Sequence, residues 1–147
     1  MSNACPLCKV DAVMTLWSDG QFRVIKVADP HLPGFVRLIS QSHVAEISDL
    51  PGAAQMQMFG LLVAIESAMR AMLTPDKINV ASLGNQVPHL HWHIIPRWKD
   101  DVYFPDSIWS APKRAADPSQ ATTAQGERQA QAEAFWKALP EICAAVR

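Results

Sequence analysis

The chain has 147 residues, of which 49% are hydrophobic and 18% are charged, and its formal net charge is -1. This length predicts one domain that buries its own core. The near-neutral balance excludes the clustered positive surface that duplex DNA or an anionic membrane normally requires, although a single pocket can still hold a small phosphorylated ligand.

The first residues show no basic stretch followed by an apolar run, so no signal peptide is predicted. The most apolar stretch, 58–65, is far shorter than the roughly 20 residues that cross a bilayer. The chain has three cysteines, two of them only three positions apart, which is a poor disulfide framework and favours a reducing compartment. We therefore expect a cytoplasmic protein with no membrane partner.

In chain order, the alternating segment 21–27 predicts a strand, the turn residues of 29–34 predict a loop, and 35–39 predicts a second strand antiparallel to the first. Apolar residues then recur at helical spacing from residue 50 to about Met72. Ser48 or Asp49 is the expected N-cap of this helix, and Thr74-Pro75 its end. The methionines of the helix are interpreted as core-filling residues.

Residues 78–82 predict a third strand, Gly84-Asn85 a turn, and the segment bracketed by Pro88 and Pro96 a fourth strand. After Trp98 the chain is polar and rich in proline through residue 118. A last helix is predicted from residue 125 to about 139, where Pro140 interrupts it. No repeat and no long linker divides the chain.

The segment His89-Leu90-His91-Trp92-His93 places imidazoles at alternate positions of the expected fourth strand. Residues two apart in a strand point to the same face, so the pattern predicts three histidines on one surface. Such a cluster suits two kinds of chemistry. Imidazoles bind transition metals, and a neutral imidazole can attack phosphorus while a neighbour holds the oxygens. We expect both roles, at different members of the row.

Cys5 and Cys8 have the spacing of half a structural zinc site, which needs two more ligands to close a tetrahedral shell. His43 and His89 are the candidates. A thioredoxin-like redox pair is disfavoured because no βαβ pattern follows the cysteines. A metal-free pair remains the main alternative.

Residues 89–95 match the histidine-triad (HIT) signature, His-φ-His-φ-His-φ-φ with φ apolar, at every position. Asn79, the turn at residues 84–87, Pro33-Gly34 and His43 also fall where this family has its characteristic residues. Over residues 5–98 the chain resembles the HIT family, and the strings at 96–101 and 104–109 look like a bacterial subgroup whose substrate is uncharacterised.

The resemblance implies an α+β fold with an antiparallel sheet of about five strands, a long central helix and a C-terminal helix. It implies a HIT domain at residues 1–110 and an extension at 111–147 whose helix packs on the same domain. HIT proteins usually form homodimers that extend the sheet across a two-fold axis, so we expect a homodimer. The C-terminal helix is a candidate wall of the specificity pocket.

The family also implies roles for two histidines. His91 would be the nucleophile that attacks the α-phosphorus of a nucleotide, giving a nucleotidyl-histidine that water hydrolyses to a nucleoside monophosphate. His93 would hydrogen-bond the phosphoryl oxygens or the leaving group, and a histidine at this position favours hydrolysis. The implied enzyme is a nucleotide hydrolase of the diadenosine polyphosphate or nucleoside phosphoramidate type.

The remaining expected site residues follow from the same resemblance. Cys5, Cys8, His43 and His89 match the ligands of a structural zinc, and no organic cofactor is expected. Asn79, at the place of the family's strand asparagine, is a candidate substrate contact. The backbone of Gly84-Asn85-Gln86 is the candidate phosphate contact, although the family usually has Gln and Ser/Thr where this chain has Asn85 and Gln86. Asp29 is a candidate ribose ligand and equally a simple turn residue. Trp109 could cover the site, pack at a subunit boundary or anchor a surface loop.

Two other functions remain open from the sequence. The chain could be a non-catalytic module that binds nucleotides, although both His91 and His93 are intact. It could also be a metal-dependent hydrolase that uses the histidine cluster as catalytic ligands, although no carboxylate ligand lies next to the motif. The preferred base and leaving group do not follow from the residues.

Overall fold

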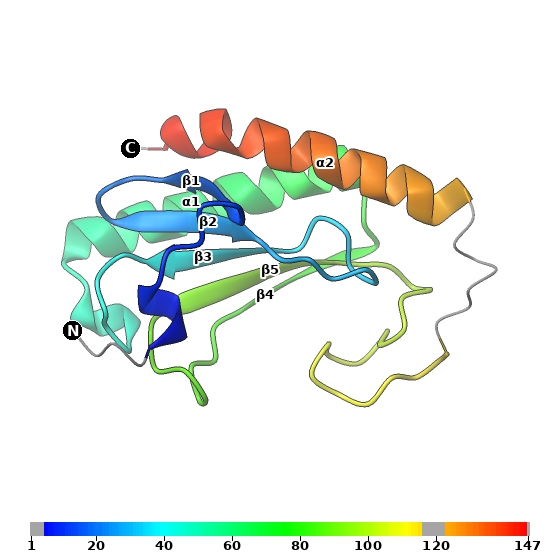
Figure 1. Cartoon of the computed structure of the whole chain (residues 1–147), viewed down its shortest axis with the longest axis horizontal. Coiled ribbons are helices and arrows are strands. Elements are labelled where there is room, and N and C mark those ends of the chain that lie inside the picture. The colour runs from blue at the N-terminus through cyan, green and yellow to red at the C-terminus, as the bar shows by residue number, and fades with distance from the viewer. Residues whose placement is uncertain (1–4, 116–122, 147) are drawn as a thin grey trace.

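The computed structural model describes residues 5–115 and 123–146, and it contains a five-stranded antiparallel sheet with two long helices on one face (Figure 1). The strand order is β1-β2-β3-β5-β4, and every neighbouring pair is antiparallel. The strands are β1 (Thr15–Ser18), β2 (Phe22–Lys26), β3 (Val36–Ser40), β4 (Lys77–Ala81) and β5 (His91–Arg97). The α+β architecture implied by the family resemblance is confirmed.

The main core lies between the sheet and the helices. Alternate residues of the central strands are fully buried against α1 (Gly52–Leu73), namely Phe22, Val24, Val36, Leu38 and Ile94. Because side chains alternate along a strand, the residues between them point to the opposite face of the sheet. Arg37, His91 and His93 therefore share that second face, where Arg37 pairs with His93 across β3 and β5.

The helix α1 buries seven residues in the core, among them Met58 and Met69, but it leaves Met56 74% exposed. The core-filling interpretation is therefore wrong for Met56, which lies on the outer face. The expected N-cap is also wrong, because Pro51 occupies that position and Asp49 closes a separate 3-10 turn, η2 (Ile47–Asp49). By length and composition alone α1 could cross a membrane, yet its buried residues face the sheet and α2, as in a core helix.

The second long helix, α2 (Thr123–Ala144), lies against α1 and β1 (Figure 1). The predicted interruption at Pro140 is wrong, because the helix continues through it. Phe135, Leu139 and Cys143 are fully buried at helical spacing. Their burial keeps the last turns on the core and outweighs the one backbone hydrogen bond that proline cannot donate. Residues 116–122, which include part of the expected proline-rich segment, lie outside the described residues.

Two features of the strands differ from the sequence-based expectation. No strand was predicted before residue 21, but β1 pairs with β2 through an irregular register between Thr15 and Trp17. The strand β5 begins at His91, so His89 precedes it. The expectation that all three histidines share one strand face is therefore wrong for His89, whose ring lies in a different cluster.

The loop after β5 is held by a buried ion pair. Arg97 Nε donates to Asp101 at 2.8 Å, and the two side chains are only 2% and 1% exposed. Burial alone would raise the pKa of Asp101, but the Arg97 guanidinium and the amides of Tyr103 and Phe104 hold it below its usual range. The loop therefore has a fixed shape, which determines where its later residues lie.

We expect Asp101→Asn to lower the free energy of unfolding by about 3–5 kcal/mol, because it leaves the buried Arg97 charge without a partner. The neighbouring substitution Asp100→Asn is the control. It breaks an exposed pair with Arg128 and should cost about 1 kcal/mol or less. Urea denaturation of both variants measures the difference, and equal losses would contradict this role for Asp101.

Candidate active site and metal centre

The imidazole of His91 is fixed by a backbone carbonyl. Its Nδ1 lies 2.6 Å from the carbonyl oxygen of His89, and the side chain is 9% exposed. A carbonyl oxygen only accepts, so Nδ1 carries the proton and donates it. In the neutral ring the lone pair is then on Nε2, which is the arrangement that a nucleophilic imidazole needs.

His93 has the opposite arrangement. Arg37 Nε donates to His93 Nδ1 at 3.3 Å, so Nδ1 is the acceptor and the ring proton is on Nε2. Burial lowers the pKa of His93 to about 4, and the positive charges of Arg37 and His91 act in the same direction. His93 is therefore a neutral hydrogen-bond donor beside the ring of His91, with the two ring centroids 5.0 Å apart.

Both histidines line a pocket of about 420 Å³. One wall is the segment from Leu83 to Val87, which contains the predicted phosphate loop of Gly84, Asn85 and Gln86. Gly84 has a φ of 78°, a conformation that side chains with a Cβ rarely adopt, so glycine is needed for this turn. The structure thus brings the predicted loop next to the triad strand.

Two predicted substrate contacts lie elsewhere. The amide oxygen of Asn79 accepts a hydrogen bond from Arg97 at 2.8 Å, and the carboxylate of Asp29 accepts one from the His31 amide at 2.8 Å. Neither residue lines the histidine pocket. In this structure Asp29 stabilises its own turn, and its contact with ribose stays a prediction, as does the contact of Asn79 with substrate.

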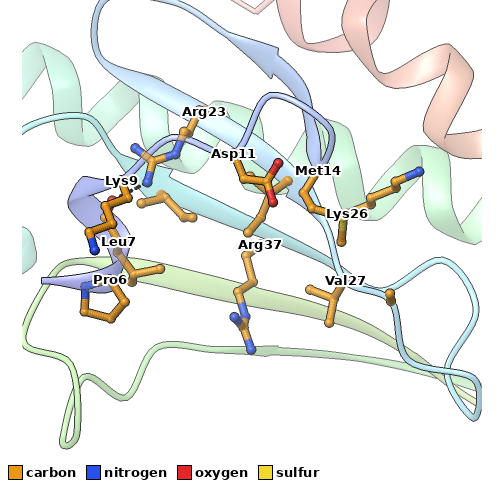
Figure 2. Close-up of a pocket in the computed structure, with 12 residues that line it drawn as sticks. Pro6, Leu7, Lys9, Asp11, Met14, Arg23, Lys26, Val27 and Arg37 are labelled. Carbon is orange, nitrogen blue, oxygen red and sulfur yellow. Dashed lines mark hydrogen bonds between the residues drawn. The ribbon is translucent and has the colours of Figure 1, made fainter.

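Sequence reasoning missed Arg37 and left the position of Trp109 open. Trp109 packs edge-on against His93, with centroids 5.0 Å apart, and is 51% exposed at the pocket. Arg37 also lines a second pocket of about 220 Å³, which shares Pro6 and Leu7 with the first (Figure 2). The signal for Arg37 was its charge in the middle of the otherwise apolar segment 35–39, but only the strand register shows that it faces His93.

The four predicted metal ligands lie together. The donor atoms of Cys5, Cys8, His43 and His89 are all within 4.8 Å of one another. Cys8 Sγ lies 3.1 Å from His43 Nδ1 and 3.6 Å from His89 Nδ1, and Cys5 Sγ lies 3.5 Å from His89 Nδ1. A tetrahedral zinc with Zn–S near 2.3 Å and Zn–N near 2.0–2.1 Å separates such atoms by about 3.5 Å. The cluster is therefore compatible with a structural zinc.

The neighbours of the cluster support this use of the ligands. His89 Nε2 lies 2.7 Å from the Ser40 carbonyl oxygen, so it donates its proton there and directs the Nδ1 lone pair toward the thiols. Arg23 donates to the Leu7 carbonyl between the two cysteines and fixes the turn η1 (Pro6–Cys8) that carries them. Four protein ligands leave no open position, so a metal here would be structural.

The fold and these two clusters define a histidine-triad protein. The family profile of the HIT domain matches residues 12–100, more than half of the chain. The chain therefore belongs to the HIT family. Similar solved structures include a histidine triad protein from Marinobacter aquaeolei VT8, with 30% identity, a TM-score of 0.61 and coverage of 84% of this chain and 93% of that one. Another, from Bradyrhizobium japonicum, has 25% identity, a TM-score of 0.62 and coverage of 84% and 96%.

Curated relatives include a bis(5'-nucleosyl)-tetraphosphatase (asymmetrical) of Schizosaccharomyces pombe, 30% identical over 86 residues that make up 55% of this chain and 47% of the relative. A bis(5'-adenosyl)-triphosphatase of Saccharomyces cerevisiae is 37% identical over 76 residues, 48% of this chain and 37% of the relative. The chain thus spans less than half the length of these relatives.

Proposed function

We propose that the protein is a nucleotide hydrolase that cleaves a phosphoanhydride or phosphoramidate bond through a nucleotidyl intermediate on His91. The observation that carries the proposal is the pair of opposite tautomers at His91 and His93, set by the His89 carbonyl and by Arg37. A module that only binds nucleotides does not need one imidazole as an acceptor and its neighbour as a donor. The two hydrolases among the curated relatives support the same chemistry.

In the proposed first step, the Nε2 lone pair of His91 forms a bond to the α-phosphorus, and the bond from phosphorus to the leaving group breaks. His93 Nε2–H donates a hydrogen bond to the phosphoryl oxygens or to the leaving atom. In the second step water attacks the same phosphorus and loses one proton to solvent. The N–P bond breaks, its electron pair returns to His91 Nε2, and a nucleoside monophosphate leaves. Splitting one displacement into two lowers each barrier, and His91 keeps its Nδ1 proton throughout.

We expect His91→Ala to lower the rate of hydrolysis of a dinucleoside tetraphosphate or an adenosine phosphoramidate by about 10⁴-fold or more, because the nucleophile is lost. Val13→Ala, at an exposed position outside the pocket, is the control, because His31 could partly substitute for Asp29 as the ribose contact. Release of nucleoside monophosphate is measured by chromatography, and mass spectrometry of quenched wild-type protein should detect a nucleotidyl adduct. Hydrolysis that persists in His91→Ala would rule out the covalent route and favour metal-dependent hydrolysis.

We also propose that Cys5, Cys8, His43 and His89 hold a structural zinc. The distances between the donor atoms support it, and a similar solved structure from Mycobacterium smegmatis is described as a Zn-bound histidine triad family protein. A reducing compartment, such as the cytoplasm that we propose for this chain, keeps both thiols available as ligands. Bound there, zinc would brace the start of β5 without touching His91.

Purified protein should contain about one zinc per chain, and Cys8→Ser should lose it and unfold at a lower temperature, because the free energy of metal binding adds to that of folding. Cys143→Ala is the matched control, since Cys143 is buried far along α2. It should lower the Tm through lost packing while keeping the zinc. Elemental analysis separates the two variants, and unchanged metal content in Cys8→Ser would contradict the proposed site.

We further propose that two copies pair through α1 and β4. The strand β4 is the last in the sheet order, so one of its edges has no neighbouring strand among the described residues. Beside it the exposed apolar residues Phe59, Val63 and Val80 form a patch that continues onto the half-buried Trp92. A second copy related by a two-fold axis would extend the sheet and cover both patches at once.

Val63→Glu should convert the dimer to a monomer, raising the dissociation constant at least about 100-fold, because it places an unpaired charge in the interface. Val63 is 64% exposed in the single chain, so the substitution should not unfold it. The control is Val13→Glu, which adds the same charge at a position that is 80% exposed and outside the patch. Light scattering after size-exclusion chromatography measures the molar mass of each variant in solution. A Val63→Glu dimer as stable as the wild type would contradict the proposed interface.

A further inference from the structure

Arg37 lies at the junction of the two pockets. Its side chain extends from β3 toward β5, with Pro6 and Leu7 on one side of it and Val27 on the other (Figure 2). Directly across the sheet it meets His93, to which its Nε donates at 3.3 Å. The guanidinium therefore lies next to the site where the proposed reaction takes place.

The charge of Arg37 has no counter-charge within the described residues. No carboxylate oxygen of residues 5–115 or 123–146 lies within ion-pair distance of its guanidinium, in contrast to the buried Arg97, which pairs with Asp101. Its two Nη groups also have no hydrogen-bond acceptor among these residues. The side chain of Arg37 is partly buried, and this burial lowers the pKa of its guanidinium.

Arg37 also lies over the Phe35 ring, with its Cζ 5.8 Å from the ring centroid, but this contact supplies no negative charge. A partly desolvated cation without a counter-charge costs free energy, and an anionic ligand would recover it. The neighbouring groups indicate which anion fits. Beside Arg37 are the nucleophilic Nε2 of His91, the donor His93 and the predicted phosphate loop at Gly84. If His91 attacks a phosphoryl group in this pocket, the non-bridging oxygens of that group lie close to Arg37, His93 and the loop at Gly84.

We propose that Arg37 is a phosphate-binding residue of this active site, whose free Nη groups contact the non-bridging oxygens of the phosphoryl group that His91 attacks. The same side chain positions His93 by occupying its Nδ1, which leaves Nε2–H directed to substrate. This inference rests on the proposed function for the identity of the reacting group. It assigns Arg37 to the reacting phosphate and not to a particular leaving group.

The expected effect of removing Arg37 follows from the negative charge that develops on the phosphoryl oxygens in the transition state. As His91 approaches phosphorus, negative charge spreads over the equatorial oxygens, and a fixed guanidinium stabilises that charge more than it stabilises bound substrate. Loss of Arg37 should therefore lower kcat more than it raises KM. Because the contact is with the reacting phosphate, the loss should be similar for a polyphosphate and an amine leaving group.

The test compares Arg37→Met, which keeps the apolar stem and removes the charge, with Arg37→Lys. The control is Arg70→Met, the same change at an exposed position on α1. We expect Arg37→Met to lower kcat about 10- to 100-fold with both a dinucleoside tetraphosphate and an adenosine phosphoramidate, the loss of one charge-assisted hydrogen bond. Arg37→Lys should recover part of kcat, and Arg70→Met should change nothing.

Two readouts do not require turnover. By calorimetry, Arg37→Met should weaken binding of AMP about 10-fold and leave adenosine binding unchanged, because only AMP carries the phosphate. By NMR, the titration of His93 should move upward from a pKa of about 4, because one of the positive charges that lower it is removed. Among the described residues, the charged or titratable groups facing His93 are Arg37 from β3 and His91 from β5, and the rings of Phe35 and Trp109 also pack against it.

The outcomes separate the two proposals. If wild-type protein hydrolyses neither substrate, while Arg37→Met weakens AMP binding and shifts the His93 titration, the proposed function fails and the phosphate-binding role of Arg37 stands. If wild-type protein is active, but Arg37→Met retains its kcat and AMP affinity, the role of Arg37 is overturned. It is also overturned if Arg70→Met produces the same losses, or if only the polyphosphate substrate is affected.

Discussion

The hydrogen bond from His91 Nδ1 to the carbonyl oxygen of His89 is the interaction on which the chemistry of the site depends. It fixes both the tautomer and the orientation of the candidate nucleophile. The carbonyl is itself held in place, because the Leu90 amide donates to the Val44 carbonyl at 2.7 Å and the Leu90 carbonyl accepts from the Ser40 amide at 3.1 Å. His89 thus contributes its backbone carbonyl to the candidate nucleophile His91 and its ring to the cysteine cluster, so one residue joins the two sites.

The two active-site imidazoles have identical chemistry and opposite protonation patterns, and their neighbours determine the difference. A carbonyl can only accept, so it forces a proton onto the near nitrogen of His91. A guanidinium can only donate, so it removes the proton from the near nitrogen of His93. Both partners lie in the rigid sheet or directly before it, so no substrate is required to establish the pattern.

Much of the fold followed from the sequence because its periodicities are strong. The alternation in 21–27 and the helical spacing after residue 50 each identify an element within a few residues of its observed bounds. The strand β1 was missed because four residues of mixed polarity carry little periodic signal, and it forms by pairing with β2. Pro140 was misleading because local propensity disfavours a helix that tertiary burial of Leu139 and Cys143 maintains.

The site residues that belong to a motif with fixed spacing could be predicted from the sequence. Residues whose side chains form hydrogen bonds elsewhere in the folded chain could not. The histidines and the C-x-x-C pair have characteristic spacing, whereas Asn79 and Asp29 were assigned by position alone. Arg97 and the His31 amide occupy their oxygens, and neither contact is visible without the folded chain. Arg37 was missed for a related reason. The role of a single charged residue in a strand can be assigned only when the strand register shows which residue lies opposite it, here His93.

The N-terminal turn η1 connects the two cysteine thiols to the walls of both pockets. Pro6 and Leu7 form part of the wall of both pockets, and they lie between Cys5 and Cys8. Oxidising either sulfur would detach this wall from the two imidazoles that hold it, while the hydrogen bond at His91 stayed intact. The affinity for a ligand would then respond to peroxide or thiol stress, although no sulfur participates in the proposed cleavage.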